Sequence, residues 1–184
     1  MKKVMTLGLV VAGALLMSGC ANKVPTYSNS PKNMRAVKSV AATAPAVNIG
    51  NFTSSNEGES KVMCRLATPV GTPDGVTFAK YIEDALSTEL EMGNMIDPKS
   101  KITVTANLDN IYGSTLLGNA YWEFKLKVTS SNGKSFDVTS RYDYESSFSA
   151  YSACTEMQRS YLPAVQELVN KIVTNPQFPE LLKS

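Results

Sequence analysis

Apolar and polar residues alternate most regularly in the middle of the chain. Every second residue is apolar from Ile102 to Leu108, and a second alternating run covers residues 120–129. After Ser131-Asn132-Gly133, a sequence typical of a tight hairpin turn, the alternation resumes over residues 136–147. This period of two predicts antiparallel strands with one face in the core and one face in solvent.

Two other stretches carry apolar residues at spacings of three and four, the period of a helix with one buried face. The first covers residues 76–92, and Gly93 follows it as a candidate C-terminal cap. The second covers residues 152–173 and contains Pro163. Because proline removes a backbone hydrogen bond inside a helix, the second stretch predicts either a kink or two helices that meet there.

Two shorter extended pieces precede the first helix, at residues 47–53 and 62–67, and Gly50 is a possible bulge in the first. Together the elements predict the α+β class. The expected architecture is a two-layer sandwich, in which an antiparallel sheet of about four strands carries two helices packed on one face. Residues 46–184 are expected to form this single domain.

The first twenty residues have a different pattern. A basic start is followed by a mostly apolar run over residues 4–17, and Ser18-Gly19-Cys20 ends the segment. The run is shorter than the ~20 residues that a membrane-spanning helix needs, but it suits the apolar region of a secretory signal. These features resemble the lipobox of bacterial lipoprotein signals, although Met17 stands where leucine is usual.

The resemblance implies that residues 1–19 are a signal peptide and that Cys20 becomes the lipidated first residue of the mature chain. An ordinary cleaved signal and an uncut membrane anchor are the alternatives. In enterobacterial lipoproteins an aspartate after the cysteine retains the protein in the inner membrane, so Ala21 implies the outer membrane, with the domain in the periplasm. Residues 20–45 are rich in Ser, Ala, Lys and Pro without periodicity, and we expect them to form the lipidated cysteine and a flexible tether.

Charge and residue usage exclude several function classes. The chain has 18 basic and 16 acidic side chains, and Lys2 and Lys3 lie in the predicted signal, so the mature chain is neutral. A neutral surface argues against nucleic acid as a partner. The chain has no histidine, which excludes Ser-His-Asp and Cys-His catalysis and zinc sites with histidine ligands. We therefore expect no enzyme, no metal and no cofactor beyond the covalent lipid.

Two arrangements of carboxylates are candidates for a functional site. Glu83 and Asp84 are adjacent in the first helix and are expected on its solvated face. Tyr142-Asp143-Tyr144 could place a carboxylate between aromatic rings, as a sugar site does, but strand alternation explains the same residues.

Lipidation of Cys20 would leave Cys64 and Cys154 as a pair in an oxidising compartment, where disulfides persist. A Cys64–Cys154 disulfide is the favoured interpretation, and two separate buried thiols are the alternative.

Several short motifs together resemble a family of uncharacterised bacterial outer-membrane lipoproteins, over roughly residues 35–182. No activity is implied by this resemblance, and it brings no catalytic residues. The motifs are Met63-Cys64-Arg65, Thr72-Pro73-Asp74-Gly75, Phe78 with Tyr81-Ile82, Ser130-Ser131-Asn132-Gly133-Lys134-Ser135, Tyr142-Asp143-Tyr144 with Ser146-Ser147-Phe148, Ala153-Cys154 and Pro163-Ala164-Val165-Gln166.

The segment from Tyr112 to Gly118 is expected to be a loop between two strands. It carries Leu116 and Leu117, which a turn does not need, so Tyr112, Leu116 and Leu117 are the candidate contacts with a partner. A hairpin tip tucked onto the core is the alternative. The favoured hypothesis is a non-enzymatic lipoprotein, anchored in the outer membrane, whose periplasmic domain is an adaptor or structural module for an envelope protein complex. The alternative is a carrier of lipid or another hydrophobic ligand for envelope transport, using space between the helices and the sheet.

Overall fold

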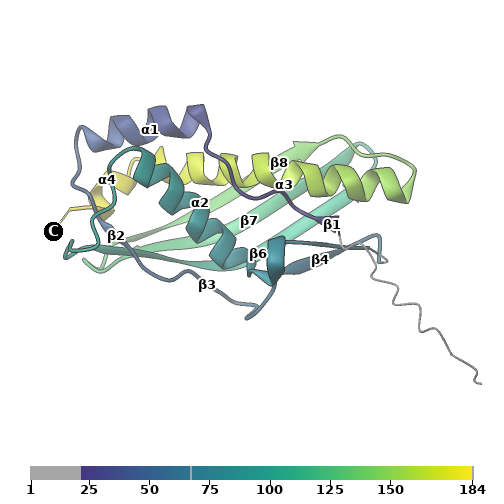
Figure 1. Ribbon diagram of the computed structural model, residues 1–184, viewed down its shortest axis with the longest axis horizontal. Helices are drawn as coiled ribbons and strands as arrows, with labels where there is room; N and C mark the ends of the chain where they lie inside the picture. Colours follow the sequence, from purple (N-terminus) through teal and green to yellow (C-terminus); the bar gives the residue numbers. More distant parts are fainter. Residues whose placement is uncertain (1–21, 67, 184) are drawn as a thin grey trace, which may run out of the picture.

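The main sheet is built on three long antiparallel strands, as the alternation predicted (Figure 1). The computed structural model describes residues 22–66 and 68–183, so Cys20 and the predicted signal peptide lie outside the described residues. The three strands are β6 (Thr103–Leu116), β7 (Asn119–Ser130) and β8 (Ser135–Tyr144). Their register places Leu126 beside both Leu108 and Val138, and all three side chains are buried.

The expectation of a purely antiparallel sheet is wrong at one edge. The predicted strand at 47–53 forms two short pieces, β2 (Asn48–Ile49) and β3 (Thr53–Ser54), and both pair with β6 in parallel. Alternation reveals which side of a strand is buried but not the direction of its partner. The strand is interrupted because the Phe52 N–H donates to Glu83 Oε2, at 2.8 Å, instead of to the sheet.

The same contact corrects the expectation for Glu83. Its side chain is buried beside the sheet edge, whereas Asp84 is exposed. Lys80 Nζ forms ion pairs with both carboxylates, so the buried Glu83 has a charged partner as well as a backbone donor. Glu83 therefore holds the β2–β3 connection and is not a solvated surface residue.

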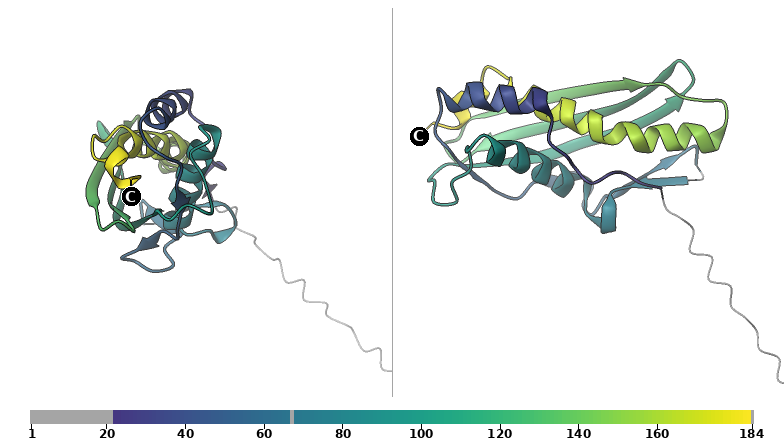
Figure 2. Two further views of the ribbon diagram at one scale, coloured as in Figure 1. Left: turned by 90° about the vertical axis from the view of Figure 1, so that its left-hand side faces the viewer. Right: turned by 45° about the horizontal axis from the view of Figure 1, so that its top comes forward.

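Within residues 22–66 and 68–183, four helices accompany the sheet, and α2 and α3 cover one of its faces, as predicted (Figure 2). The helices are α1 (Pro31–Ala41), α2 (Phe78–Met92), α3 (Ala150–Val173) and α4 (Phe178–Leu181), and a short 3₁₀ turn, η1 (Pro73–Gly75), precedes α2. Helix α3 continues through Pro163 as one helix, so the expectation of two separate helices is not met.

The layer between α2, α3 and the sheet is filled with aromatic side chains. Tyr161 of α3 lies at its centre, with its ring centroid 5.1 Å from that of Trp122 and 5.6 Å from that of Phe78. The Trp122 indole N–H donates to the Met157 carbonyl at 3.0 Å, which satisfies its buried polar group. Burial of these large rings is the main stabilising contribution to this layer.

The predicted tether at residues 20–45 is wrong over the part that the structure describes. Residues 22–23 form the strand β1 (Asn22–Lys23), and α1 packs on α2 and α3 with Val37 and Val40 buried. The segment has few apolar residues, so its composition is that of a linker, but those few lie on one face of a helix. Gly93 allows this packing, because a Cβ atom there would lie 2.2 Å from Val37 Cγ1.

A buried carboxylate holds the same segment in place. Glu89 of α2 is fully buried, and its Oε1 accepts hydrogen bonds from the Tyr27 hydroxyl and the Ser30 N–H, both at 2.7 Å. Burial, together with the hydrogen bond to Glu89, raises the pKa of Tyr27, so its hydroxyl stays protonated and donates. Glu89 thus receives donors from the chain that leads into α1.

The predicted loop at 112–118 is also wrong in extent. Strand β6 continues to Leu116 and the turn to β7 consists of Leu117 and Gly118 only. A bulge between Leu108 and Asn110 shifts the register, so the alternation read from the first half of the strand does not hold in the second half.

A second, small sheet has the order β1-β5-β4, with β4 (Lys61–Cys64) and β5 (Thr68–Gly71) forming a hairpin and β1 parallel to β5. Figures 1 and 2 show that this sheet, the β6–β7 turn and the β8–α3 connection lie toward one end of an elongated molecule, and that α4 and the C-terminus lie at the other.

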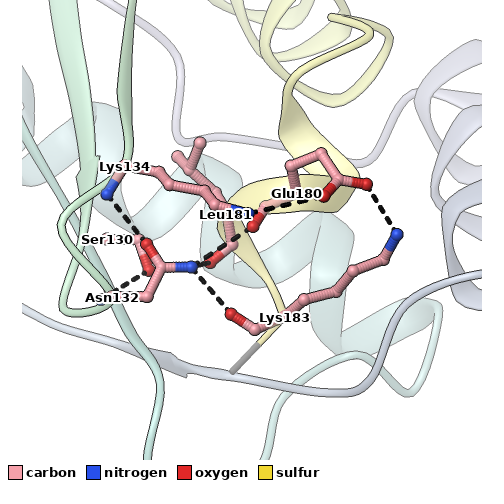
Figure 3. Close-up of polar contacts among 6 residues, drawn as sticks. All are labelled: Ser130, Asn132, Lys134, Glu180, Leu181 and Lys183. Atoms are coloured by element: carbon pink, nitrogen blue, oxygen red, sulfur yellow. Dashed lines mark hydrogen bonds and ion pairs between the residues drawn. The ribbon is translucent and has the colours of Figure 1, made fainter.

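At the C-terminal end, the β7–β8 turn holds α4 (Figure 3). The Ser130 hydroxyl donates to the Leu181 carbonyl at 2.7 Å, and the Asn132 side-chain amide donates to the Lys183 carbonyl, also at 2.7 Å. The last carbonyls of a helix lack partners within the helix, and Asn132 caps α4 because its amide also donates to the Glu180 and Leu181 carbonyls, both at 3.2 Å. The hydrogen bond from Lys183 lowers the pKa of the Glu180 carboxyl on the surface of this cluster. These polar residues have a structural role.

Replacing Glu89 with alanine should detach residues 22–41 from the domain. The Tyr27 hydroxyl and the Ser30 N–H would lose their acceptor, and unpaired buried donors of this kind cost about 3 kcal/mol together. We expect urea unfolding to show that loss in the free energy of unfolding, and trypsin to cleave faster after Lys32 and Arg35. Glu91→Ala, at an exposed position of the same helix, is the control and should change neither. An E89A protein as stable and as resistant as the wild type would refute this role for Glu89.

Candidate functional site

Large apolar side chains on the surface gather at one end of the molecule. Among the described residues, eight large hydrophobic side chains are exposed, and seven of them lie on the segments that meet at the end opposite the C-terminus. The eighth, Met92, ends α2. Such clustering marks an interaction surface more often than scattered exposure does. We call this surface the apolar end; its residues are Met63, Leu66, Tyr112, Leu116, Leu117, Phe148 and Tyr151.

Three segments that are distant in sequence build the apolar end. The β4–β5 hairpin supplies Met63 and Leu66, the β6–β7 hairpin supplies Tyr112, Leu116 and Leu117, and the start of α3 with the connection before it supplies Phe148 and Tyr151. Figure 1 shows these segments close together in space. The long strands β6–β8 carry the second and third segments to this end, and the small sheet places the first one against them.

The Arg65 side chain joins the three segments. Its guanidinium donates to the Phe148 carbonyl at 2.8 Å, to the Ser147 carbonyl at 2.5 Å and to the Thr115 carbonyl at 3.3 Å. All three acceptors are backbone oxygens. Ser147 and Phe148 lie in the connection between β8 and α3, and Thr115 lies near the end of β6. One side chain of the β4–β5 turn thus fixes both the β6–β7 hairpin and the β8–α3 connection.

The Cys64–Cys154 disulfide joins two of the same three segments. The two Cα atoms are 5.7 Å apart and both cysteines are buried. The pairing predicted from the sequence is therefore present in the structure, and two separate thiols are excluded. It fastens the β4–β5 hairpin to the first turns of α3, next to the bonds that Arg65 makes.

The apolar end contains a groove between the β4–β5 hairpin and the β6–β7 hairpin. Its volume is about 600 Å³, and its apolar walls are formed by Met63, Leu66, Tyr112, Leu116 and Leu117. Met63, Tyr112 and Leu117 are each about half exposed, so one side of each is supported by the fold while the other lines the groove.

The Tyr144 hydroxyl holds the β6–β7 hairpin to β8. It donates to the Ser114 carbonyl at 2.8 Å, and burial raises the pKa of this tyrosine, so it remains a donor. The Ser146 hydroxyl donates to the Thr115 carbonyl at 2.8 Å. These two bonds hold the hairpin that carries Leu116 and Leu117 to the end of β8. The position of the hairpin therefore does not require a ligand or partner in the groove.

The carboxylate considered for a sugar site does not have the setting of a catalytic acid. Asp143 is 69% exposed and its Oδ1 lies 2.8 Å from a guanidinium nitrogen of Arg141, whose side chain stacks over the Tyr121 ring. This is an ion pair on the surface of the domain. In residues 22–66 and 68–183 no group of three or more metal-ligating side chains is found, and none of the helices described there is long and apolar enough to cross a membrane.

The three residues predicted as partner contacts lie together, and their contact with a partner stays a prediction. Tyr112, Leu116 and Leu117 were predicted as contacts, and the structure brings all three into the groove. Met63, Leu66, Phe148 and Tyr151 were missed. Their positions in the sequence gave one indication of exposure. Leu66 lies in a short turn after a strand, and Phe148 and Tyr151 flank the start of a helix at positions outside its buried face.

Comparison with known proteins adds no relative. No protein-family model matches the chain, and a search of the curated proteins gives no match. The resemblance to outer-membrane lipoproteins stays a prediction.

The disulfide should contribute strongly to stability, because it closes a loop with a sequence separation of 90 residues. On the chain-entropy model such a loop is worth about 4 kcal/mol, and we expect the C64S/C154S variant to lose roughly this amount in urea unfolding. Alkylation before reduction should label neither Cys64 nor Cys154 in the wild type. Two labelled thiols before reduction, or an unchanged unfolding free energy in the variant, would contradict the assignment.

Proposed function

We propose that this protein is a non-enzymatic lipoprotein, anchored in the outer membrane through a lipid on Cys20, whose periplasmic domain binds an envelope protein. The observation that carries the proposal is the concentration of seven exposed apolar side chains at one end of the domain. The basic start, the apolar run of residues 4–17 and the Ser18-Gly19-Cys20 ending support the anchor.

The groove is the surface that we assign to the protein partner. A volume of about 600 Å³ accepts one or two large side chains of a partner, and its walls are predominantly apolar. Arg65 and Tyr112 line it as well, and these residue types are enriched among the side chains that dominate binding energy in protein interfaces. A protein segment that inserts an apolar side chain between the two hairpins fits this combination.

The carrier of lipid or another hydrophobic ligand is the less favoured function. It requires space between the helices and the sheet, and in the described residues Trp122, Phe124 and Tyr161 fill that layer with less than 2% exposure each. A ligand there would have to displace packed aromatic rings, at a cost of several kcal/mol.

The L116S/L117S variant should lose the partner while it keeps its fold. Both leucines are more than half exposed, so their replacement removes little buried area, and the unfolding free energy should change by less than about 1 kcal/mol. Cross-linking in living cells followed by mass spectrometry should recover at least about tenfold less of the envelope protein that the wild type captures, since two contacts in the groove are lost.

Met92→Ser is the matched control, because Met92 is exposed to a similar degree but lies on α2 away from the groove. Its capture should equal that of the wild type. Undiminished capture by L116S/L117S would dismiss the groove as the contact surface.

A further inference from the structure

Within the apolar end, three side chains are the most exposed. Leu66 is 93% exposed, Phe148 86% and Tyr151 80%, whereas Leu116 is 67% exposed and Met63, Tyr112 and Leu117 are near 50%. We call Leu66, Phe148 and Tyr151 the tip. Leu66 stands where the tip and the rim of the groove meet, and the other two do not line the groove.

The tip is built as a rigid unit. Arg65, next to Leu66 in sequence, donates to the backbone carbonyls of Ser147 and Phe148, and the Cys64–Cys154 disulfide joins the same two segments. The Ser149 hydroxyl accepts the Ser152 N–H and caps α3 between Phe148 and Tyr151. Exposed apolar residues on loops usually lie on weakly held segments, but these lie on a cross-linked frame.

The backbone that presents Leu66 is in an unfavourable conformation. Arg65 and Leu66 have φ angles of 47° and 60°, in the left-handed region that bulky side chains disfavour. No glycine or asparagine occupies these two positions, although either would relax the turn. A strained turn that holds a leucine outward, where it gains no burial in the fold, is a feature that clusters at functional sites.

The described chain also begins beside the tip. Strand β1 is parallel to β5 and pairs Asn22 with Val70, two residues along β5 from Thr68, where the turn that carries Leu66 ends. Figures 1 and 2 show β1 beside the β4–β5 hairpin. Two peptide units separate the Cα atoms of Cys20 and Asn22, and each spans ~3.8 Å, so a lipid anchor on Cys20 keeps Asn22 within ~7.6 Å of the anchoring residue.

We propose that the tip inserts into the interfacial layer of the lipid bilayer and orients the domain with this end toward the membrane. This inference rests on the proposed lipid anchor. With so short a connection, the anchor brings the end of the domain that carries the tip to the bilayer surface, where leucine and phenylalanine enter the acyl boundary and tyrosine lies at the level of the headgroups. The tip then contacts lipid, and the groove beside it is left for a protein in the same membrane.

The test uses the mature lipidated protein in vesicles of phosphatidylethanolamine and phosphatidylglycerol, with and without bromine on the acyl chains. A single new tryptophan is introduced as F148W, since bromine quenches only tryptophans that it closely approaches. The wild-type Trp122 is fully buried and serves as the internal reference. The fluorescence that F148W adds should fall at least about twofold in brominated vesicles, as expected for a side chain at the acyl boundary.

M92W is the matched control, because Met92 is exposed on α2, away from the tip. Its added fluorescence should be the same in both kinds of vesicle. Adding L66S and Y151S to F148W should reduce the quenching, and all three positions are exposed enough to change without unfolding the domain.

The outcomes separate this inference from the proposed function. Protein that carries no lipid on Cys20 by mass spectrometry would not load onto the vesicles, which would overturn the anchor and the inference together. Lipidated protein in which F148W is unquenched, or in which F148W and M92W are quenched equally, would overturn the inference alone. A cross-link from position 148 to a partner protein in cells would also overturn it, in favour of a protein occupant.

Discussion

The apolar end depends on one interaction above all, the disulfide between Cys64 and Cys154. The small sheet β1-β5-β4 has few residues and would be marginal alone. Joined to the start of α3, its β4–β5 hairpin stands against the ends of the long strands. Arg65 can then reach three carbonyls that belong to two other segments. Without that connection the β4–β5 hairpin would not be fastened to α3, and neither the groove nor the tip would have a fixed shape.

The fold could be predicted as far as side-chain burial determines it. Alternation located β7 and β8 within a few residues, and the helical period located α2 and α3, because each of these elements has one continuous buried face. It could not give the direction of β2 and β3, since a half-buried strand has the same pattern in either orientation. The bulge in β6 shifts the register, so the pattern read before it could not be extended through the strand.

The errors at Glu83 and at residues 22–41 share one cause. Composition marks a carboxylate as a surface residue and a Ser-, Asn- and Pro-containing segment as a linker. A carboxylate and a polar segment can both be buried when the carboxylate accepts hydrogen bonds that the segment donates. Glu89 accepts from the Tyr27 hydroxyl and the Ser30 N–H, and Glu83 accepts from the Phe52 N–H. Such pairings depend on residues 31 to 62 positions apart, which no local pattern contains. The site shows the same limit. Leu116 and Leu117 are unusual for a turn and can be noticed locally, whereas Leu66 and Phe148 come together in the tip only through Arg65 and the disulfide.

We therefore propose that binding takes place at one end of the domain, beside the proposed lipid anchor, and that the remainder of the fold supports this end. Photo-cross-linking in living cells, from a photoreactive residue at Leu117 and, in a separate strain, at Met92, tests this most directly. We predict that a defined envelope protein is cross-linked from position 117 and is not cross-linked from position 92. The same products from both positions, or no protein other than this chain itself from position 117, would contradict the proposal.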